Sequence, residues 1–181
     1  MGQNESSKAN TRDRGAASPA FLLAQVGAHA ASRFAERLGP LELTPAHVGS
    51  MRIIAASPGS SQQQVAERLG MFPSRFVALL DELQDRGLVE RRENPNDRRT
   101  YVLEVTPQGK EVLQSVGRVA RDHQEALFAS LTKDECDLLA SLLLRVANQQ
   151  GLRPGVHPGF ARLRPEAAKN AKSTDKSRSA R

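Results

Sequence analysis

The sequence has a single cysteine and no long apolar run among its 181 residues. One cysteine excludes a disulfide within the chain and any zinc or iron–sulfur site that needs several cysteines of one chain. No stretch approaches the roughly 18–20 apolar residues of a membrane-spanning helix, and the N-terminus lacks the apolar core of a secretion signal. The sequence therefore predicts a cytoplasmic protein without a membrane segment.

Catalytic motifs are missing as well. The chain has no glycine-rich phosphate loop, no HExxH zinc motif and no nucleophile elbow. Its four histidines are scattered and do not have the spacing of a metal site. We therefore expect no catalytic activity, no metal and no cofactor, and a binding function becomes the leading interpretation.

Positive charge is present in excess. The chain has 26 lysine and arginine residues against 20 aspartate and glutamate residues, for a net charge of +6. This sign favours an acidic partner, with nucleic acid first. Residues 1–17 carry +1, residues 18–150 carry −1 and residues 151–181 carry +6. A middle part that binds DNA must therefore use a few well-placed cations rather than its net charge.

The composition divides the chain into three parts. Residues 1–17 are polar and contain no aromatic residue, which predicts a disordered N-terminal tail. Residues 151–181 are rich in proline, glycine, serine and lysine, which predicts a basic, disordered C-terminal tail. That tail is either a solubilising extension or an auxiliary contact with DNA phosphates. Residues 18–150 are expected to hold the folded unit.

The middle part carries repeated helix-start signals. At three places, a serine or threonine that can cap a helix stands directly before a proline suited to the first helical position. Two capping boxes mark further helix starts. The first three signals are Ser18-Pro19, Thr44-Pro45 and Thr106-Pro107, and the boxes pair Ser60 with Gln63 and Thr132 with Glu135. The predicted helices are 19–38, 45–56, 61–69, 73–86, 107–129 and 133–149.

Residues 88–105 change from helical spacing to strand alternation. Tyr101, Leu103 and Val105 fall on one face of an extended chain, and the residues between them fall on the other. The segment 93–99 is rich in turn formers. We therefore expect a hairpin that packs on neighbouring helices, because an isolated hairpin is only marginally stable in water.

The helices expected over 61–69 and 73–86 form a pair. Gly70 supplies a tight turn between them, and the small Ala66 allows the second helix to approach closely. The second helix turns its apolar residues inward and leaves four residues to project outward, namely Ser74, Arg75, Ala78 and Glu82. This arrangement is typical of a helix-turn-helix, and the hairpin that follows makes it winged.

Several segments together carry a family likeness. The strongest is D-x-R followed by an apolar strand that ends in a helix-starting threonine, which runs here from Asp97 to Thr106. The others are Leu43-Thr-Pro-Ala46, Gln64-Val-Ala-Glu-Arg-Leu-Gly70, Leu80-Asp-Glu-Leu83 and Arg86-Gly-Leu-Val-Glu-Arg91. In these segments the chain resembles the MarR family of bacterial transcriptional regulators, over about residues 19–148.

The resemblance implies a mainly α fold with a small two- or three-stranded β wing. A DNA-binding lobe would occupy about 45–105, and helices 19–38, 107–129 and 133–149 would join two copies into a homodimer. The last helix supports a dimer independently, because its apolar residues cover more than one narrow stripe and need a second partner surface. These residues are Leu138, Leu139, Leu142, Leu143, Leu144 and Val146. A helix buried within a monomer is the alternative.

Two elements are expected to contact double-stranded DNA. The helix that starts at Pro73 would enter the major groove, where Arg75 can offer two donors to guanine and Ser74 can bond a base edge or a phosphate. A phosphate contact or a solvated charge is the alternative for Arg75. Ser61 and Gln62 begin the supporting helix, whose first N–H groups can meet a phosphate.

At the wing, the resemblance implies that the tip arginines reach DNA. Arg98 is expected to enter the minor groove, since a narrow groove rich in A·T pairs has an enhanced negative potential. Arg99 is expected to contact the phosphate backbone or to pair with Asp97, which helps to structure the tip. The alternative is a charged turn that only faces solvent.

The resemblance also implies a small aromatic or anionic effector in a cleft between the dimerisation helices and the lobe. His29, His47 and Met51 are candidates to line it, with ordinary packing as the alternative. The leading interpretation is a homodimeric repressor that binds a palindromic operator and is released by the effector.

Two other functions stay open. An architectural DNA-binding protein without an effector would also fit the basic tail. A thiol-based redox sensor would use Cys136, which lies in the first turn of the last expected helix. That position favours a thiolate, whereas the neighbouring Asp134, Glu135 and Asp137 oppose it. A structural or incidental cysteine is therefore the favoured interpretation.

Overall fold

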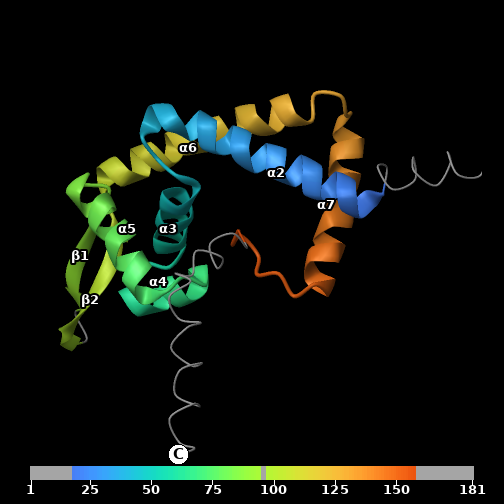
Figure 1. The fold of residues 1–181 in the computed structure, drawn as a ribbon. Coiled ribbons are helices and arrows are strands. Elements are labelled where there is room, and N and C mark those ends of the chain that lie inside the picture. Colours follow the sequence, from blue (N-terminus) through green and yellow to red (C-terminus); the bar gives the residue numbers. More distant parts are fainter. Residues whose placement is uncertain (1–17, 95–96, 158–181) are drawn as a thin grey trace, which may run out of the picture.

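The computed structural model describes the backbone of residues 18–94 and 97–157 and, within these ranges, the side chains outside 97–100. Figure 1 shows the order of the elements. They are α2 (Pro19–Leu38), the 3-10 helix η1 (Gly39–Leu41), α3 (Pro45–Ala56), α4 (Gln62–Leu69), α5 (Pro73–Asp85), β1 (Val89–Asn94), β2 (Asp97–Val105), α6 (Pro107–Leu127) and α7 (Lys133–Gln149). The six expected helices and the mainly α class are confirmed. The predicted N-terminal tail lies outside the described residues.

Hydroxyl caps explain where the helices begin. Ser18, Thr44 and Thr106 each accept a hydrogen bond from the backbone N–H three residues later, at 3.0–3.2 Å. A proline occupies the first helical position each time. The predicted capping box of Thr132 and Glu135 at α7 is also present.

The capping box at α4 lies one residue later than predicted. It pairs Ser61 with Gln64, whereas the sequence pattern indicated Ser60 with Gln63. Ser60 is buried, and its carbonyl accepts a hydrogen bond from the Leu103 N–H at 3.0 Å. The backbone of Ser60 therefore belongs with the sheet, which delays the start of the helix.

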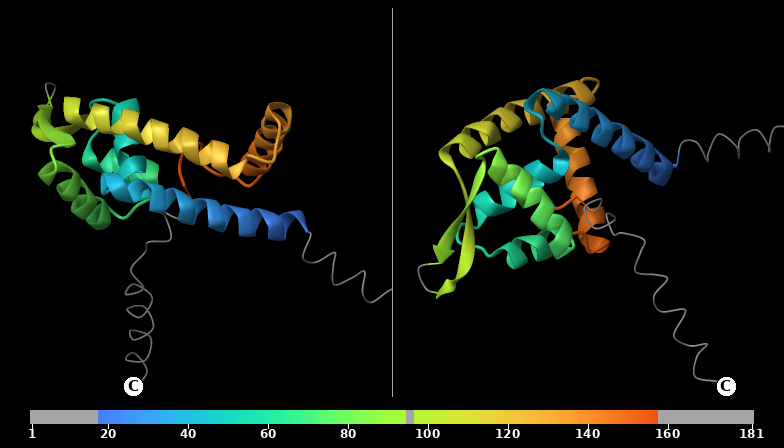
Figure 2. Two further views of the ribbon diagram at one scale, coloured as in Figure 1. Left: turned by 90° about the horizontal axis from the view of Figure 1, so that it is seen from above. Right: turned by 60° about the vertical axis from the view of Figure 1, so that its left-hand side comes forward.

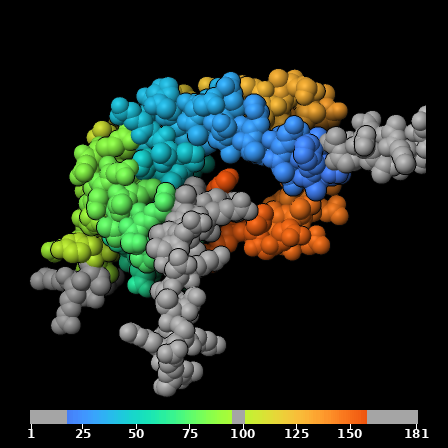
Figure 3. Space-filling view, viewed as in Figure 1, coloured from blue at the N-terminus to red at the C-terminus, as the bar shows by residue number. Residues whose placement is uncertain are grey.

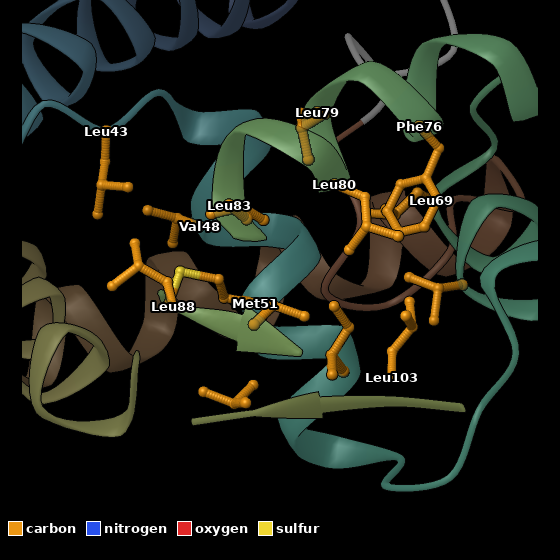
Figure 4. Close-up of a cluster of buried hydrophobic side chains, with 14 of the residues drawn as sticks. Leu43, Val48, Met51, Leu69, Phe76, Leu79, Leu80, Leu83, Leu88 and Leu103 are labelled. Carbon is orange, nitrogen blue, oxygen red and sulfur yellow. The ribbon is translucent and has the colours of Figure 1, made fainter. Parts of the chain in front are cut away.

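One hydrophobic core joins α3, α4, α5 and the hairpin (Figure 4). In this view the labelled side chains of α5, α3 and β2 point toward one another, and Phe76, Leu80 and Leu83 of α5 are fully buried. Burial of each such side chain stabilises the fold by about 1.5–3 kcal/mol. Because one face of α5 is packed in the core, the helix has a fixed orientation, and the residues on its opposite face point outward.

β1 and β2 form an antiparallel hairpin in which Val89 pairs with Val105. The sheet of the described residues thus has two strands, within the predicted range of two or three, and an isolated bridge joins Ser61 to Val102. Burial does not follow the alternation of side chains along β2, because Val102 is buried whereas Tyr101 is 57% exposed. Ser61 pairs along the edge of β2 at Val102. Val102 and Leu103, which point to opposite faces of the strand, are both buried there.

α2 and α6 lie side by side and extend away from the lobe, and α7 turns back at their far end (Figures 1 and 2). In the space-filling view, α2 and α7 form an arm beyond the lobe (Figure 3). α7 has no buried residue, and α2 buries only Leu38. None of the described helices combines the length and apolarity that a membrane span requires.

Residues 151–157, which follow the end of α7, fold back onto the lobe. Arg153 Nη1 donates a hydrogen bond to the Glu67 carbonyl of α4 at 2.7 Å, and the half-buried Val156 packs against the lobe core. Residues 151–157 therefore do not extend into solvent, although the composition of 151–181 predicts a tail. Residues 158–181 lie outside the described part of the chain.

Candidate nucleic-acid interface

The helix-turn-helix consists of α4, a short turn and α5. Gly70 ends α4 in the left-handed conformation, with φ of 65°, and its N–H reaches the carbonyls of Ala66 and Glu67. Residues with a Cβ rarely adopt this conformation, which confirms the predicted role of the glycine. Met71 is buried beneath the turn. The turn thus sets the angle between α4 and α5.

The start of α5 faces outward. Ser74, Arg75 and Ala78 are exposed, while Phe76 and Leu79 on the other face are buried. The backbone N–H of Arg75 donates to the Phe72 carbonyl at 3.1 Å, but within the described residues its guanidinium has no hydrogen-bond or ion-pair partner. Its guanidinium is therefore available to an acceptor outside the chain, such as a base edge or a phosphate.

The start of α4 is partly occupied by its own cap. The Ser61 hydroxyl accepts from the Gln64 N–H at 3.3 Å, and the Gln64 side chain accepts from the Ser61 N–H at 2.8 Å. The side-chain oxygen of Gln62 lies 3.4 Å from Arg91 Nη2 of β1. The N–H groups of Gln62 and Gln63 are the ones left in this first turn for an outside anion.

Two arginines of β1 hold the wing. Arg91 Nη2 bonds Asp81 Oδ1 of α5 at 2.8 Å, which ties the hairpin to the helix that precedes it. Arg92 contacts Glu90 at 2.6 Å and Glu104 of β2 at 3.2 Å. The hydrogen bond to Glu90, with the charge of Glu104, raises the pKa of Arg92 above its usual value. The Arg91 tie links the position of the wing to that of α5.

The wing tip carries Asp97, Arg98 and Arg99 as the first residues of β2, with Asn94 paired to Asp97 across the turn. The side chains of Asp97, Arg98 and Arg99 lie outside the described residues. Figure 1 places this end of the hairpin, like α4, on the side of the lobe away from α2 and α6. The fold therefore carries the tip arginines on the same side as the helix-turn-helix.

The three candidate effector residues do not line one cleft. Met51 is fully buried in the lobe core, and His47 is only 6% exposed. His29 is exposed on α2, next to α6. Ordinary packing thus accounts for Met51, and a ligand could reach it only if the core opened.

His47 links α3 to α5. Its Nδ1 accepts a hydrogen bond from the Thr44 N–H at 3.1 Å, as the third helical residue of a capping box. In the neutral ring the proton is then on Nε2, which lies 2.9 Å from Glu82 Oε2 and donates to it. A histidine three residues after a capping threonine is the sequence signal for this role, and sequence reasoning missed it.

Arg86 is a second residue that sequence reasoning missed. It follows the end of α5 and donates to the carbonyls of Glu42 at 2.7 Å and Leu41 at 2.9 Å. These bonds attach α5 to the connection between α2 and α3. Glu42 has a left-handed φ of 52°, and the arginine stabilises the carbonyls of that turn. The only signal in the sequence was that Arg86 belongs to a family-like segment.

Cys136 is half-buried in the first turn of α7. The Glu135 side chain beside it accepts hydrogen bonds from the Thr132 N–H and hydroxyl, and these bonds lower the pKa of Glu135. The carboxylate that caps α7 therefore belongs to the residue directly before Cys136.

Comparisons with known proteins agree with this geometry. Residues 41–100, from η1 through β1 and into β2, match the model of the MarR family. A protein of Thauera aromatica, assigned as a transcriptional regulatory protein for the hcr operon, is 31% identical over 112 residues. The match covers 62% of this chain and 68% of that protein.

Solved structures share the fold. The transcriptional repressor CouR, bound to a 23-mer DNA duplex, has a TM-score of 0.65 and 31% identity, covering 74% of this chain and 95% of CouR. A mutant of MarR from E. coli in complex with operator DNA has a TM-score of 0.61 and 25% identity, with 74% and 96% covered. The chain therefore belongs to the MarR family of DNA-binding transcriptional regulators.

Proposed function

We propose that this protein is a repressor that binds a palindromic operator as a homodimer and releases it when a small molecule binds. The observation that carries the proposal is the exposed start of α5, where the guanidinium of Arg75 has no hydrogen-bond or ion-pair partner among the described residues. The wing beside it has two arginines at its tip. CouR and the E. coli MarR mutant are both complexes with DNA, which supports a duplex as the partner.

In this proposal α5 supplies the base contacts. An α-helix fits the major groove, and the N-terminal residues of a recognition helix reach the base edges. Arg75 would offer two donors to guanine O6 and N7, and Ser74 would bond a neighbouring base or a phosphate. The first N–H groups of α4, at Gln62 and after the Ser61 cap, would meet a phosphate.

The wing supplies the minor-groove contact. Arg98 would enter the groove and Arg99 would bond the phosphate backbone or Asp97. The bond between Arg91 and Asp81 supports this arrangement, because it holds the hairpin against α5. The major-groove and minor-groove contacts of one lobe would then have a fixed separation.

A second copy would cover the apolar surface of α2 and α7. An apolar hollow of about 630 Å³ lies between these helices, and apolar surface of this extent marks an interface. Nine large apolar side chains of the two helices are 38–59% exposed, namely Phe21, Leu22, Leu23, Val26, Leu138, Leu142, Leu143, Leu144 and Val146. A two-fold dimer presents two lobes, and a palindrome presents two matching half-sites.

The effector would act on the distance between the two lobes. Operator binding requires one particular distance between the lobes. A ligand that binds more tightly to a dimer with a different distance favours that state and so reduces the fraction of dimer bound to DNA. The interior position of Met51 and the bond between His47 and Glu82 leave His29, on α2, as the candidate that a ligand can reach.

Replacement of Arg75 or Arg98 with alanine is expected to weaken operator binding by about 1–3 kcal/mol, roughly 5- to 150-fold, because each variant loses one groove contact. Fluorescence anisotropy with a labelled operator measures this loss. Arg118→Ala is the matched control, because it removes the same charge from an exposed position of α6. Equal losses in all three variants, or no loss at Arg75 and Arg98, would contradict the assigned interface.

A further inference from the structure

Residues 151–157 run from the end of α7 back to the lobe (Figure 1), and we call them the strap. The likeness to the MarR family runs over about residues 19–148, so the strap follows the part of the chain that carries this likeness. α7 itself has no buried residue. The strap is therefore a separate attachment of the end of α7 to the lobe.

A glycine cap fixes the direction in which the strap leaves α7. Gly151 has a left-handed φ of 64°. Its N–H donates to the Asn148 carbonyl at 3.1 Å, and the Leu152 N–H donates to the Ala147 carbonyl at 3.0 Å. This pair of bonds is the Schellman motif, which ends a helix and turns the chain away from its axis. The chain therefore leaves α7 in a defined direction.

The strap contains a second turn, over Arg153-Pro-Gly-Val156. The Val156 N–H donates to the Arg153 carbonyl at 3.3 Å, and Gly155 has a left-handed φ of 72°. Proline in the second position and glycine in the third are the residues that a type II turn requires. The turn brings its two end residues, Arg153 and Val156, close together.

Both end residues of this turn contact the lobe. Arg153 Nη1 donates to the Glu67 carbonyl at 2.7 Å. That carbonyl belongs to the last turn of α4, where a cation is favoured. Val156 is half-buried against the lobe core, and together with Ile53 of α3 it lines a hollow of about 480 Å³. The strap thus contacts both helices that precede α5.

The strap gives the lobe a second connection to the arm of α2 and α7. The first connection runs through α6, which begins directly after β2 and packs against α2. A body joined at one place can rotate about that place, whereas a second connection limits the rotation. Because α4 packs against α5, the strap also holds α5 in one position relative to the arm.

We propose that the strap sets the distance between the two α5 helices of the dimer, and thereby the separation of half-sites that the dimer accepts. Arg153 is the positioning residue, and Val156 supports it through apolar packing. This inference rests on the proposed homodimer on a palindromic operator and names the residues that select the spacing. One base pair changes the separation of half-sites by about 3.4 Å and rotates one against the other by about 35°. A lobe with two connections rejects this change, and a lobe with one tolerates it.

Operators of different spacing test the proposal by fluorescence anisotropy with the full chain. The duplexes are the preferred operator, the same operator with one base pair added or removed between its half-sites, and a single half-site. The wild-type protein should bind the preferred spacing at least about tenfold more tightly than the altered ones. In Arg153→Ala and in Val156→Ser this ratio should fall to about threefold or less. Affinity for the single half-site should not change, because the contacts of one lobe are intact.

Arg118→Ala is the matched control, because this exposed arginine of α6 also donates one hydrogen bond, to Ser115, and lies outside the strap. It should retain the wild-type ratio. Thermal unfolding shows whether each variant is folded, and the exposed position of Arg153 makes Arg153→Ala the safer variant if Val156→Ser does not fold. Strap variants with the wild-type ratio, or with equal losses on every duplex including the single half-site, would overturn the proposal.

A measurement without DNA checks the same claim. Gln63→Cys places one spin label on the exposed face of α4 in each lobe, in a Cys136→Ser background that removes the native thiol. Pulsed electron resonance then gives the distribution of distances between the two lobes. Arg153→Ala should broaden this distribution, and Arg118→Ala should not. Identical distributions in the wild type and in Arg153→Ala would contradict the role of the strap.

Sedimentation separates this inference from the proposed function. A wild-type chain that sediments as a monomer, or that binds every duplex with equal affinity, contradicts the proposed function and the inference together. A dimer that prefers one operator, but whose tolerance of altered spacing is the same with and without Arg153, contradicts the inference alone.

Discussion

Replacing Gly109 with alanine is expected to destabilise the protein by about 3 kcal/mol, at the upper end of the usual cost of overpacking. Gly109 is buried in the first turn of α6. A Cβ at this position would lie directly against the carbonyl oxygen of Leu88 and 2.7 Å from Cγ1 of Val105. The same carbonyl accepts a hydrogen bond from the Thr106 N–H at 3.2 Å. Relief of the clash would therefore separate α6 from the end of β2 and from Leu88, the residue before β1.

Thermal unfolding at equal protein concentration measures this effect, and a loss of about 3 kcal/mol corresponds to roughly 6–12 °C for a domain of this size. Gly117→Ala is the matched control on the same helix. The nearest atom to its new Cβ is Arg121 Nη1 at 3.8 Å, and alanine favours a helix over glycine by about 0.5–1 kcal/mol. If Gly109→Ala were as stable as the wild type, the packing of α6 on the wing would be refuted.

Replacing Leu142 with aspartate is expected to separate the proposed dimer. Leu142 is 45% exposed in the single chain and lines the apolar hollow between α2 and α7. A two-fold interface would bury the new carboxylate twice without a partner, which costs several kcal/mol. The dissociation constant of the dimer should therefore rise at least about 100-fold, and operator binding should weaken because single lobes bind half-sites independently.

Analytical ultracentrifugation measures the dimer, and anisotropy measures operator binding on the same samples. Ser141→Asp is the matched control, because this exposed residue of α7 does not line the apolar hollow. It should remain dimeric and retain operator affinity. A Leu142→Asp variant that sediments as the wild type does would show that α2 and α7 do not form the interface.

Local signals were sufficient to predict the helices. The hydroxyl caps and first-position prolines at Ser18, Thr44 and Thr106 act within one turn of the chain, and the structure has each of them. The start of α4 was misplaced by one residue because the Ser60 carbonyl bonds Leu103. That bond joins residues 43 positions apart, and no local pattern contains it.

Contacts between distant segments limited the prediction of the site. The spacing of α5 indicated correctly that Ser74 and Arg75 are exposed. The sequence did not show that Glu82, also expected to project outward, holds His47 across 35 positions. In the same way, the family resemblance made His29 a candidate for ligand binding, but the neighbouring His123 comes from a helix that only tertiary packing places beside α2.

Selection of binding sites from random DNA duplexes by the full chain, repeated at several salt concentrations, tests the DNA-reading interface most directly. If each of two lobes carries one α5 helix and one wing, the selection should enrich one sequence that has two half-sites related by two-fold symmetry. Affinity for that sequence should exceed the affinity for random duplex at every salt concentration. Binding to all duplexes with equal affinity, changed only by salt, would instead show a protein that coats DNA without reading its sequence.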